Sequence, residues 1–299
     1  MRWRRRRSAR TEAVFATGSE GAVHLWNVTN PRHPTPLGEP LGAGDRAVVS
    51  LAFCAGGDIL VSGDEGGKVH RWRLTDPGHP VPFGGPPLEG NADTVDSIAC
   101  SPDGRLLAVA GTAMVKMWDL AAQTPAPLGT LIAGHGQAVN AVAFTPDGQS
   151  MAAAADDGLV SLWDIKDPRN ATPLGPPLRA HGDPVTSVAF SQKDPRTIAT
   201  ASDDKTLRVW DLTVRERPVP LGPPLEGHQA AVNSVAIGAN GIMASASDDQ
   251  TVRLWDLSRL DLIRQDPLAY ACLRTGRGFN PDKWKSHIPA LPYQKTCPG

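Results

Sequence analysis

Residues 63–69 are the part of the sequence that most resembles a nucleotide-binding motif. They read Gly-Asp-Glu-Gly-Gly-Lys-Val. In a phosphate-binding loop the glycines stand further apart, and a Ser or Thr after the Lys reaches magnesium. Here the spacing is one residue short, and Val69 occupies the position of the magnesium ligand. The segment is better explained as a turn before Trp72, so it predicts no nucleotide cofactor.

Other catalytic signatures are missing from the sequence. No two His residues lie at metal-ligand spacing on one expected element, and no Gly-x-Ser-x-Gly motif presents a nucleophile. We therefore predict a protein that is not an enzyme, with no cofactor and no metal. A catalytic site assembled from distant loops is the alternative, including a metal held by channel acids such as Asp96.

Six Trp residues define an internal repeat. They lie at intervals of 46, 46, 45, 47 and 45 residues, and a rare residue spaced so evenly indicates a repeat architecture. The six are Trp26, Trp72, Trp118, Trp163, Trp210 and Trp255. We assign the repeat array to residues 11–257, with an incomplete first unit that begins at its second strand, residues 13–17.

Each unit reads as four short antiparallel strands. Apolar and polar residues alternate before the Trp, as at 207–210, and residues 139–144 and 198–202 are further strands. A Pro-Leu-Gly or Pro-Phe-Gly phrase recurs once in most units, and Pro is tolerated on an edge strand because it has no N–H to donate. A set of Pro-rich ligands for an aromatic groove is the alternative. One such sheet cannot bury its faces alone, so we predict an all-β fold, a β-propeller of about six four-stranded blades.

The repeat resembles the WD40-repeat β-propeller family. Trp-Asp pairs end four of the units, and Gly-His pairs at 134–135 and 227–228 match the start of the family's repeat. The resemblance implies a buried, structural hydrogen-bond chain of His, Ser or Thr, Asp and Trp in each blade. Its members by position are His135, Asp157 and Trp163; His181, Thr200, Asp204 and Trp210; and His228, Ser245, Asp249 and Trp255. Ala153 replaces the hydroxyl of the fourth unit, and the second and third units lack the His and the Asp. The C-terminal blades are therefore expected to be the better locked.

Polar residues at two recurring positions predict a binding surface. In the family, one polar residue of the innermost strand and the residue before the turn Asp reach the top face beside the central channel. The candidates here are Ser50, Asp96, Asn140, Thr186, Asn233, Glu65, Asp156, Asp203 and Asp248. Together they would make a polar ring with a net negative charge, which suits a partner that presents a basic segment. A plain solvated rim is the alternative.

Charge is distributed unevenly along the chain. The first ten residues hold six Arg and no acid, and the rest carries 24 Lys and Arg against 31 Asp and Glu. An acidic body argues against nucleic acid as the partner. No apolar run is long enough to span a membrane, and no apolar run follows the basic start as in a signal peptide. We expect residues 1–10 to be a disordered basic segment; an arm for nucleic acid or acidic lipid is the alternative.

Residues 258–299 read as a helical tail that packs on the propeller. Pro267 and Pro281 each follow a capping residue and start a helix. The expected apolar faces pair Leu268 with Cys272 and Trp284 with Ile288. The sequence of the tail resembles that of bacterial, chiefly actinobacterial, multi-WD-repeat signalling proteins. In those proteins the propeller often follows an NTPase or a kinase domain.

The four Cys residues are far apart in the sequence. Cys54, Cys100, Cys272 and Cys297 form no CxxC pair, which suits reduced thiols and a cytoplasmic protein. We expect Cys272 and Cys297 to be two buried thiols; a disulfide between them in an exported protein is the alternative.

Binding, rather than catalysis, is the function that the sequence favours. We predict a non-catalytic protein–protein interaction scaffold that binds a partner protein on the top face, with no evident small-molecule substrate. Two alternatives stay open: the truncated C-terminal sensor portion of a larger signalling NTPase or kinase, and a metal-dependent propeller enzyme.

Overall fold

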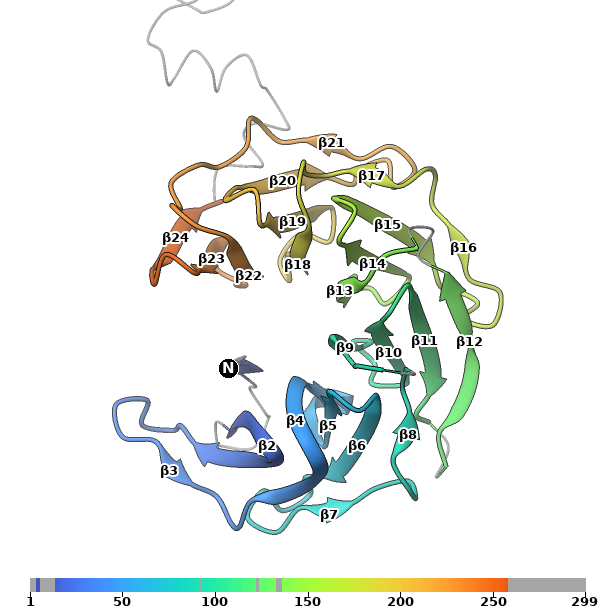
Figure 1. The fold of residues 1–299 in the computed structure, drawn as a ribbon, viewed down its shortest axis with the longest axis vertical. Coiled ribbons are helices and arrows are strands. Elements are labelled where there is room, and N and C mark those ends of the chain that lie inside the picture. Colours follow the sequence, from blue (N-terminus) through green and yellow to red (C-terminus); the bar gives the residue numbers. More distant parts are fainter. Residues whose placement is uncertain (1–3, 6–13, 92, 122–123, 133–135, 258–299) are drawn as a thin grey trace, which may run out of the picture.

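The computed structural model describes residues 4–5, 14–91, 93–121, 124–132 and 136–257. Sheets follow one another in an open arc around a central space, and β4, β9, β13, β18 and β22 are the strands that face this space (Figure 1). The all-β propeller architecture is confirmed. The tail at 258–299 lies outside the described residues, and so do its expected helices, Cys272 and Cys297.

The first sheet contains the first two repeat units. It consists of β1 (Arg4–Arg5), β2 (Val14–Asn27), β3 (Thr35–Pro36), β4 (Leu41–Cys54), β5 (Ile59–Asp64), β6 (Lys68–Arg73), β7 (Val81–Pro82) and β8 (Leu88–Glu89). The strand order is β1-β2-β4-β5-β6-β7, with β3 on β2 and β8 on β6. Because the start of β4 pairs with β2 and its end pairs with β5, this strand joins blade 1 (β1–β3) to blade 2 (β4–β8). A short 3₁₀ turn, η1 (Ala55–Gly57), follows β4.

The remaining four sheets are one blade each. Blade 3 consists of β9 (Ser97–Cys100), β10 (Leu106–Gly111), β11 (Met114–Asp119) and β12 (Ala126–Ile132). Blade 4 consists of β13 (Val139–Phe144), β14 (Ser150–Ala155), β15 (Leu159–Asp164), β16 (Thr172–Pro173) and β17 (Leu178–Arg179). Blade 5 consists of β18 (Val185–Phe190), β19 (Thr197–Ser202), β20 (Leu207–Asp211) and β21 (Val219–Pro220). Blade 6 has three strands, β22 (Val232–Ile237), β23 (Ile242–Ser247) and β24 (Val252–Asp256).

The recurring Pro residues lie on the outer strands, as their missing N–H predicts. Each pairs with the Trp of its own unit, and the pairs are Trp26–Pro36, Trp72–Pro82, Trp118–Pro127, Trp163–Pro173 and Trp210–Pro220. A Pro at this edge fills the outer position without needing a further strand.

The hydrophobic core is divided among the spaces between blades. Five clusters of buried side chains each join two neighbouring blades, and one of them packs Leu207 and Val209 of blade 5 against Val235 and Met243 of blade 6. Each blade therefore buries its faces against its neighbours, which is how repeat proteins build a continuous core.

Two observations at the N-terminal end differ from expectation. Arg4 and Arg5, within the segment expected to be disordered, form β1 and pair with Ala16 and Phe15. Cys54 and Cys100, expected to be separate thiols, are joined by a disulfide across blades 2 and 3, with their Cα atoms 5.4 Å apart. In the part of the chain that is described, no helix is long and apolar enough to cross a membrane.

Candidate functional site

Blade 5 brings together the four residues of the expected hydrogen-bond chain. The His181 Nδ1 atom lies 2.9 Å from the Asp204 carboxylate, and its Nε2 atom lies 2.8 Å from the Thr200 hydroxyl. The Trp210 indole N–H donates to the same hydroxyl at 3.2 Å. A single set of protons satisfies every atom: Trp210 donates to Thr200, Thr200 donates to His181, and His181 donates to Asp204. The chain therefore holds His181 as a neutral ring.

Blade 6 repeats this arrangement. His228 lies 2.8 Å from Asp249 and 2.8 Å from Ser245, and the Trp255 indole donates to Ser245 at 2.9 Å. The two His side chains are fully buried. These His and Asp residues link the turn between two strands to the Trp of the next strand, so their chemistry is structural.

The pKa values in blade 5 follow from this burial. Burial lowers the pKa of His181 because the charged ring would lose its hydration, and the nearby Asp204 opposes the shift only in part. Burial alone would raise the pKa of Asp204, but hydrogen bonds from Thr206 and His181 lower it. The pair is thus a neutral ring beside a stable carboxylate.

Blade 4 shows what happens when one member is missing. Ala153 stands where Thr200 stands in blade 5, and the Trp163 indole N–H is buried without a partner among the described residues. The Trp118 indole N–H of blade 3, whose unit has Val109 at this position, is also buried without a partner among the described residues. Asp157 of blade 4 accepts a hydrogen bond from the backbone of Leu159, and His135 lies outside the described residues.

Blades 1 and 2 use other contacts. The Trp26 indole donates to Thr17 at 3.0 Å. In blade 2, the buried Asp64 accepts hydrogen bonds from the backbone N–H groups of Gly66 and Lys68, and its second oxygen lies 3.5 Å from His70 Nε2. Asp64 therefore stabilises the turn of blade 2. Counted back from the Trp of its own unit, it lies two residues earlier than Asp204 does in blade 5.

The candidate binding residues gather at one end of the blades, which we call the acidic face. Its acids are Glu65, Asp156, Asp203 and Asp248, each exposed in the turn between the second and third strand of its blade. Each of these residues donates its backbone N–H to the chain at or just before the inner strand of the same blade, at 3.0–3.1 Å; the acceptors are Ala47, Ala138, Pro184 and Ala231. The backbone beneath these carboxylates is therefore the same in four blades.

Three carboxylates from neighbouring blades influence one another on this face. Burial raises the pKa of Asp203, and the negative charges of Asp156, Asp183 and Asp248 raise it further. Within the described chain, no Lys or Arg forms an ion pair with Asp156, Asp203 or Asp248. Asp183 is a member of this group that its sequence position did not reveal, because it comes from the loop before β18.

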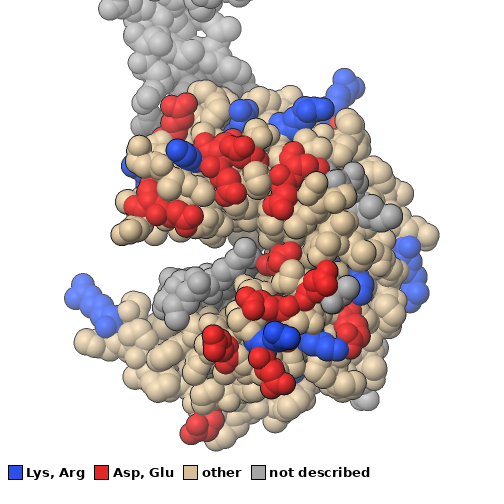
Figure 2. Space-filling view, in the orientation of Figure 1, with Lys and Arg blue, Asp and Glu red and all other residues tan. Residues whose placement is uncertain are grey.

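Figure 2 shows the acidic face around the central opening. Groups of Asp and Glu side chains lie over the neighbouring blades of β14, β19 and β23, with few Lys or Arg between them. In the residues that the structure describes, no group of three His, Cys, Asp or Glu is placed to hold a metal ion.

The polar candidates of the inner strands make contacts within their own blade, with the next blade, or with both. Asn140 donates to Asp156 at 2.7 Å and to the Val185 carbonyl of blade 5 at 3.2 Å, and Asn233 donates to Asp248. Thr186 donates to the Ala201 and Val232 carbonyls, and Asp96 accepts from Thr94. Asn140 and Asn233 thus orient carboxylates of the acidic face. Asn140 and Thr186 each have a second role, a hydrogen bond to the following blade.

Ser50 does not belong with these residues, and its assignment to the binding surface is wrong. Its side chain is buried, and its hydroxyl accepts the Ile98 N–H of blade 3 at 2.9 Å. Ser97 and Ser187 make the same contact with the following blade. The ladder between β4 and β5 skips Val49, as that between β13 and β14 skips Asn140, so Val49 is the counterpart of the polar residues. The recurring Val-x-Ser phrase marks the buried hydroxyl, which stitches adjacent blades together.

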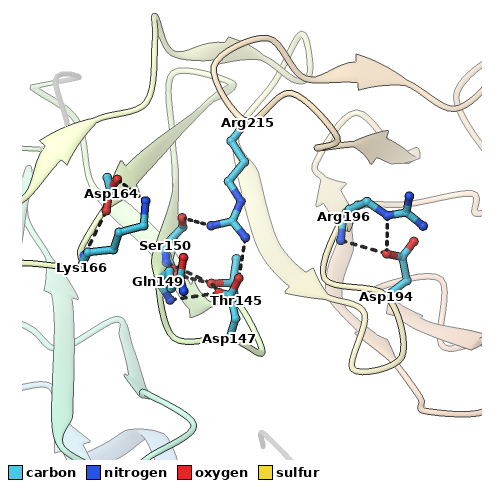
Figure 3. Close-up of polar contacts among 9 residues, drawn as sticks. All are labelled: Thr145, Asp147, Gln149, Ser150, Asp164, Lys166, Asp194, Arg196 and Arg215. Carbon is cyan, nitrogen blue, oxygen red and sulfur yellow. Dashed lines mark hydrogen bonds and ion pairs between the residues drawn. The ribbon is translucent and has the colours of Figure 1, made fainter.

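At the opposite end of the blades, Arg215 links blade 5 to blade 4. Figure 3 shows its guanidinium directed at Ser150 and Asp147, at distances of 2.7 and 2.6 Å. The same Asp147 accepts from Thr145 and from the backbone of Gln149. The Asp147 carboxylate at this end thus has an Arg partner, whereas Asp156, Asp203 and Asp248 of the acidic face form no ion pair with a described Lys or Arg.

Together, the radial antiparallel sheets, the regularly spaced Trp residues and the buried His–Asp chains of blades 5 and 6 define a WD-repeat β-propeller. The chain belongs to the family described as "Nucleolar protein 10-like, N-terminal domain", which matches residues 46–260. A chain in the "Crystal Structure of Mitotic Checkpoint Complex" has a similar fold, with a TM-score of 0.69 and 22% identity, over 81% of this chain and 73% of that one. A search of curated proteins gave no match.

Proposed function

We propose that this protein is a non-catalytic interaction scaffold whose acidic face binds a partner protein through a basic segment. The observation that carries the proposal is the group of carboxylates contributed by blades 4, 5 and 6, in which burial and then repulsion raise the pKa of Asp203. A Lys or Arg side chain from a partner would relieve this repulsion. Charge complementarity of this kind sets the rate of association and the register of a complex.

The buried contacts support a rigid platform. The backbone positions of Asp156, Asp203 and Asp248 are held by hydrogen bonds of 3.0–3.1 Å to their own blades. Asn140 orients one of these carboxylates and also contacts the next blade. A preorganised surface loses little conformational freedom on binding. The fully buried His181 and His228, by contrast, are positioned for structure and have no access to a substrate.

The test is a charge reversal on the acidic face. The triple variant Asp156→Lys, Asp203→Lys and Asp248→Lys should abolish capture of the partner from native cells, and wild-type capture should weaken as salt rises. The matched control reverses three exposed acids elsewhere, Glu39, Asp167 and Glu216. It changes the net charge equally and should retain capture.

Both triple variants must keep the melting temperature of the wild type, since exposed substitutions leave the core intact. Equal capture by the acidic-face variant and the wild type would overturn the proposal. Equal loss in both variants would show that net charge, and not this surface, governs binding.

A further inference from the structure

Blade 6 ends in an apolar face that no described residue covers. Val252 and Leu254 of β24 are 68% and 72% exposed, whereas the same positions in blade 5, Leu207 and Val209, are 0% and 6% exposed. In blades 1, 3 and 4 the corresponding residues are all buried as well: Val23, Leu25, Val115, Met117, Val160 and Leu162. The neighbouring Ala244 and Ala246 of β23 are also partly exposed, although Ala199 and Ala201 of blade 5 are fully buried.

The edge of the same blade is open too. Blade 6 has only three strands, and no outer strand pairs with β24 in the described chain. In blades 1 to 5 a Pro-containing strand occupies that edge. A strand edge that no described strand covers, beside exposed Val and Leu side chains, is a surface that proteins usually cover.

The chain itself supplies a segment at this place. Residue 258 follows β24 after a single residue, Leu257, and 42 residues remain from there to Gly299. Because strands in a sheet lie about 4.8 Å apart and an extended residue spans about 3.3 Å, a few residues suffice to cross blade 6. The remaining length is ample for a layer over its face.

The chemistry of this segment fits the surface. It holds seven Lys and Arg against three Asp, opposite in sign to the propeller body. Its large apolar side chains include Leu268, Phe279, Trp284, Ile288 and Leu291. These side chains need an apolar surface, and Val252 and Leu254 offer one next to the point where the segment begins.

We propose that residues 258–299 fold back over the open face of blade 6 and take the place of a following blade. The apolar side of the predicted helix at residues 266–276, with Leu268 and Cys272, covers Val252 and Leu254. The end of the arc is thus closed by the chain's own tail and not by a second copy of the protein.

Accessibility of a single introduced thiol tests the covering. In the full chain, Leu254→Cys should react with a maleimide at least ten times more slowly than Arg253→Cys. Arg253 is the neighbouring residue on the opposite side of β24, is exposed and serves as the matched control. Melting temperatures show that both variants fold. Equal labelling rates would overturn the proposal.

Crosslinking identifies the occupant. Under mild oxidation, Leu254→Cys should form a disulfide with Cys272 or Cys297 of the same chain, found by peptide mapping, and Arg253→Cys should not. Mixed samples of isotopically light and heavy protein separate crosslinks within a chain from those between chains. Crosslinks between chains would show that a second copy covers the face and would refute the assignment. The lack of any crosslink to the tail would refute it as well.

Discussion

Blades 5 and 6 and blades 2 and 3 are stabilised by different means. In blades 5 and 6, a buried His joins the turn Asp to a hydroxyl and a Trp. Blades 2 and 3 lack this chain, and a disulfide between Cys54 and Cys100 joins their inner strands. The first device fixes strands within one blade, and the second fixes one blade to the next. A repeat can therefore lose its internal hydrogen-bond chain where another contact holds it in the array.

The largest expected effect is the removal of a His from an intact chain. His181→Ala leaves the Asp204 carboxylate and the Thr200 hydroxyl without their shared partner in a largely buried site. Breaking a buried, hydrogen-bonded pair costs about 3–5 kcal/mol. The free energy of unfolding, measured by chemical denaturation, should fall by about this amount.

The control for His181→Ala is His79→Ala, which removes the same side chain from an exposed site where its ring hydrogen-bonds Asp76. Its unfolding free energy should match that of the wild type. If the two variants are equally stable, the hydrogen-bond chain does not distinguish blade 5 from its neighbours.

The second effect concerns the disulfide. Cys54 and Cys100 are separated by 46 residues, so their bond restricts a long loop of the unfolded chain. Such a crosslink contributes about 2–4 kcal/mol. The double variant Cys54→Ala, Cys100→Ala should lose stability by this amount under oxidising conditions, and it should be about as stable as the wild type after reduction of the wild type.

A count of free thiols in the denatured wild type checks the same point independently. Labelling of Cys54 and Cys100 before reduction would mean that the pair is not bonded. Blades 2 and 3 would then have neither of the two stabilising devices.

The fold could be predicted from the sequence because most repeats contain the same marker residues at the same positions. The Trp spacing gave the number of units, and the Pro residues marked the outer strands that pair with each Trp. The chains in blades 5 and 6 follow from residues at fixed distances from Trp210 and Trp255. These patterns can be recognised in the sequence because the residues that make the contacts lie within one blade, at short and fixed sequence distances.

Contacts between blades were harder to predict. Ser50 was misplaced because the position that holds a polar residue in the other blades holds the apolar Val49 in blade 2, and the next polar residue was taken in its place. The disulfide left a signal that could have been used: Cys54 and Cys100 lie 46 residues apart, one repeat length, and thus at equivalent places in adjacent blades. Arg215, which reaches from blade 5 to Asp147, left no such signal.

A gain of stability is the third expected effect, since blade 4 lacks only the hydroxyl. Ala153→Ser places an acceptor beside the buried Trp163 indole N–H, which has no partner among the described residues. One satisfied hydrogen bond contributes about 1 kcal/mol, and the unfolding free energy should rise accordingly. Ala154→Ser is the matched control. Its hydroxyl enters the fully buried packing between blades 4 and 5, and it should destabilise the protein. A loss in both variants would mean that the site has no room for an oxygen.

The smallest effect is a dependence on pH that comes from the intact chain of blade 5. Burial lowers the pKa of His181 below its value in the unfolded chain, about 6.5. Below this pH the unfolded state binds more protons than the native state, so stability should fall as the pH drops from about 6.5 toward the lowered native pKa. Asp204 shifts in the same sense, but its lowered pKa matters only below the ordinary range of a carboxyl, near 3.8. Between pH 7 and pH 5, His181 contributes together with His70 of blade 2, whose pKa is also lowered by burial. Melting temperatures across this interval should decline in the wild type and decline less in His181→Gln, which cannot titrate. Parallel curves for the two proteins would assign the pH dependence to other groups, such as His70, and not to the hydrogen-bond chain of blade 5.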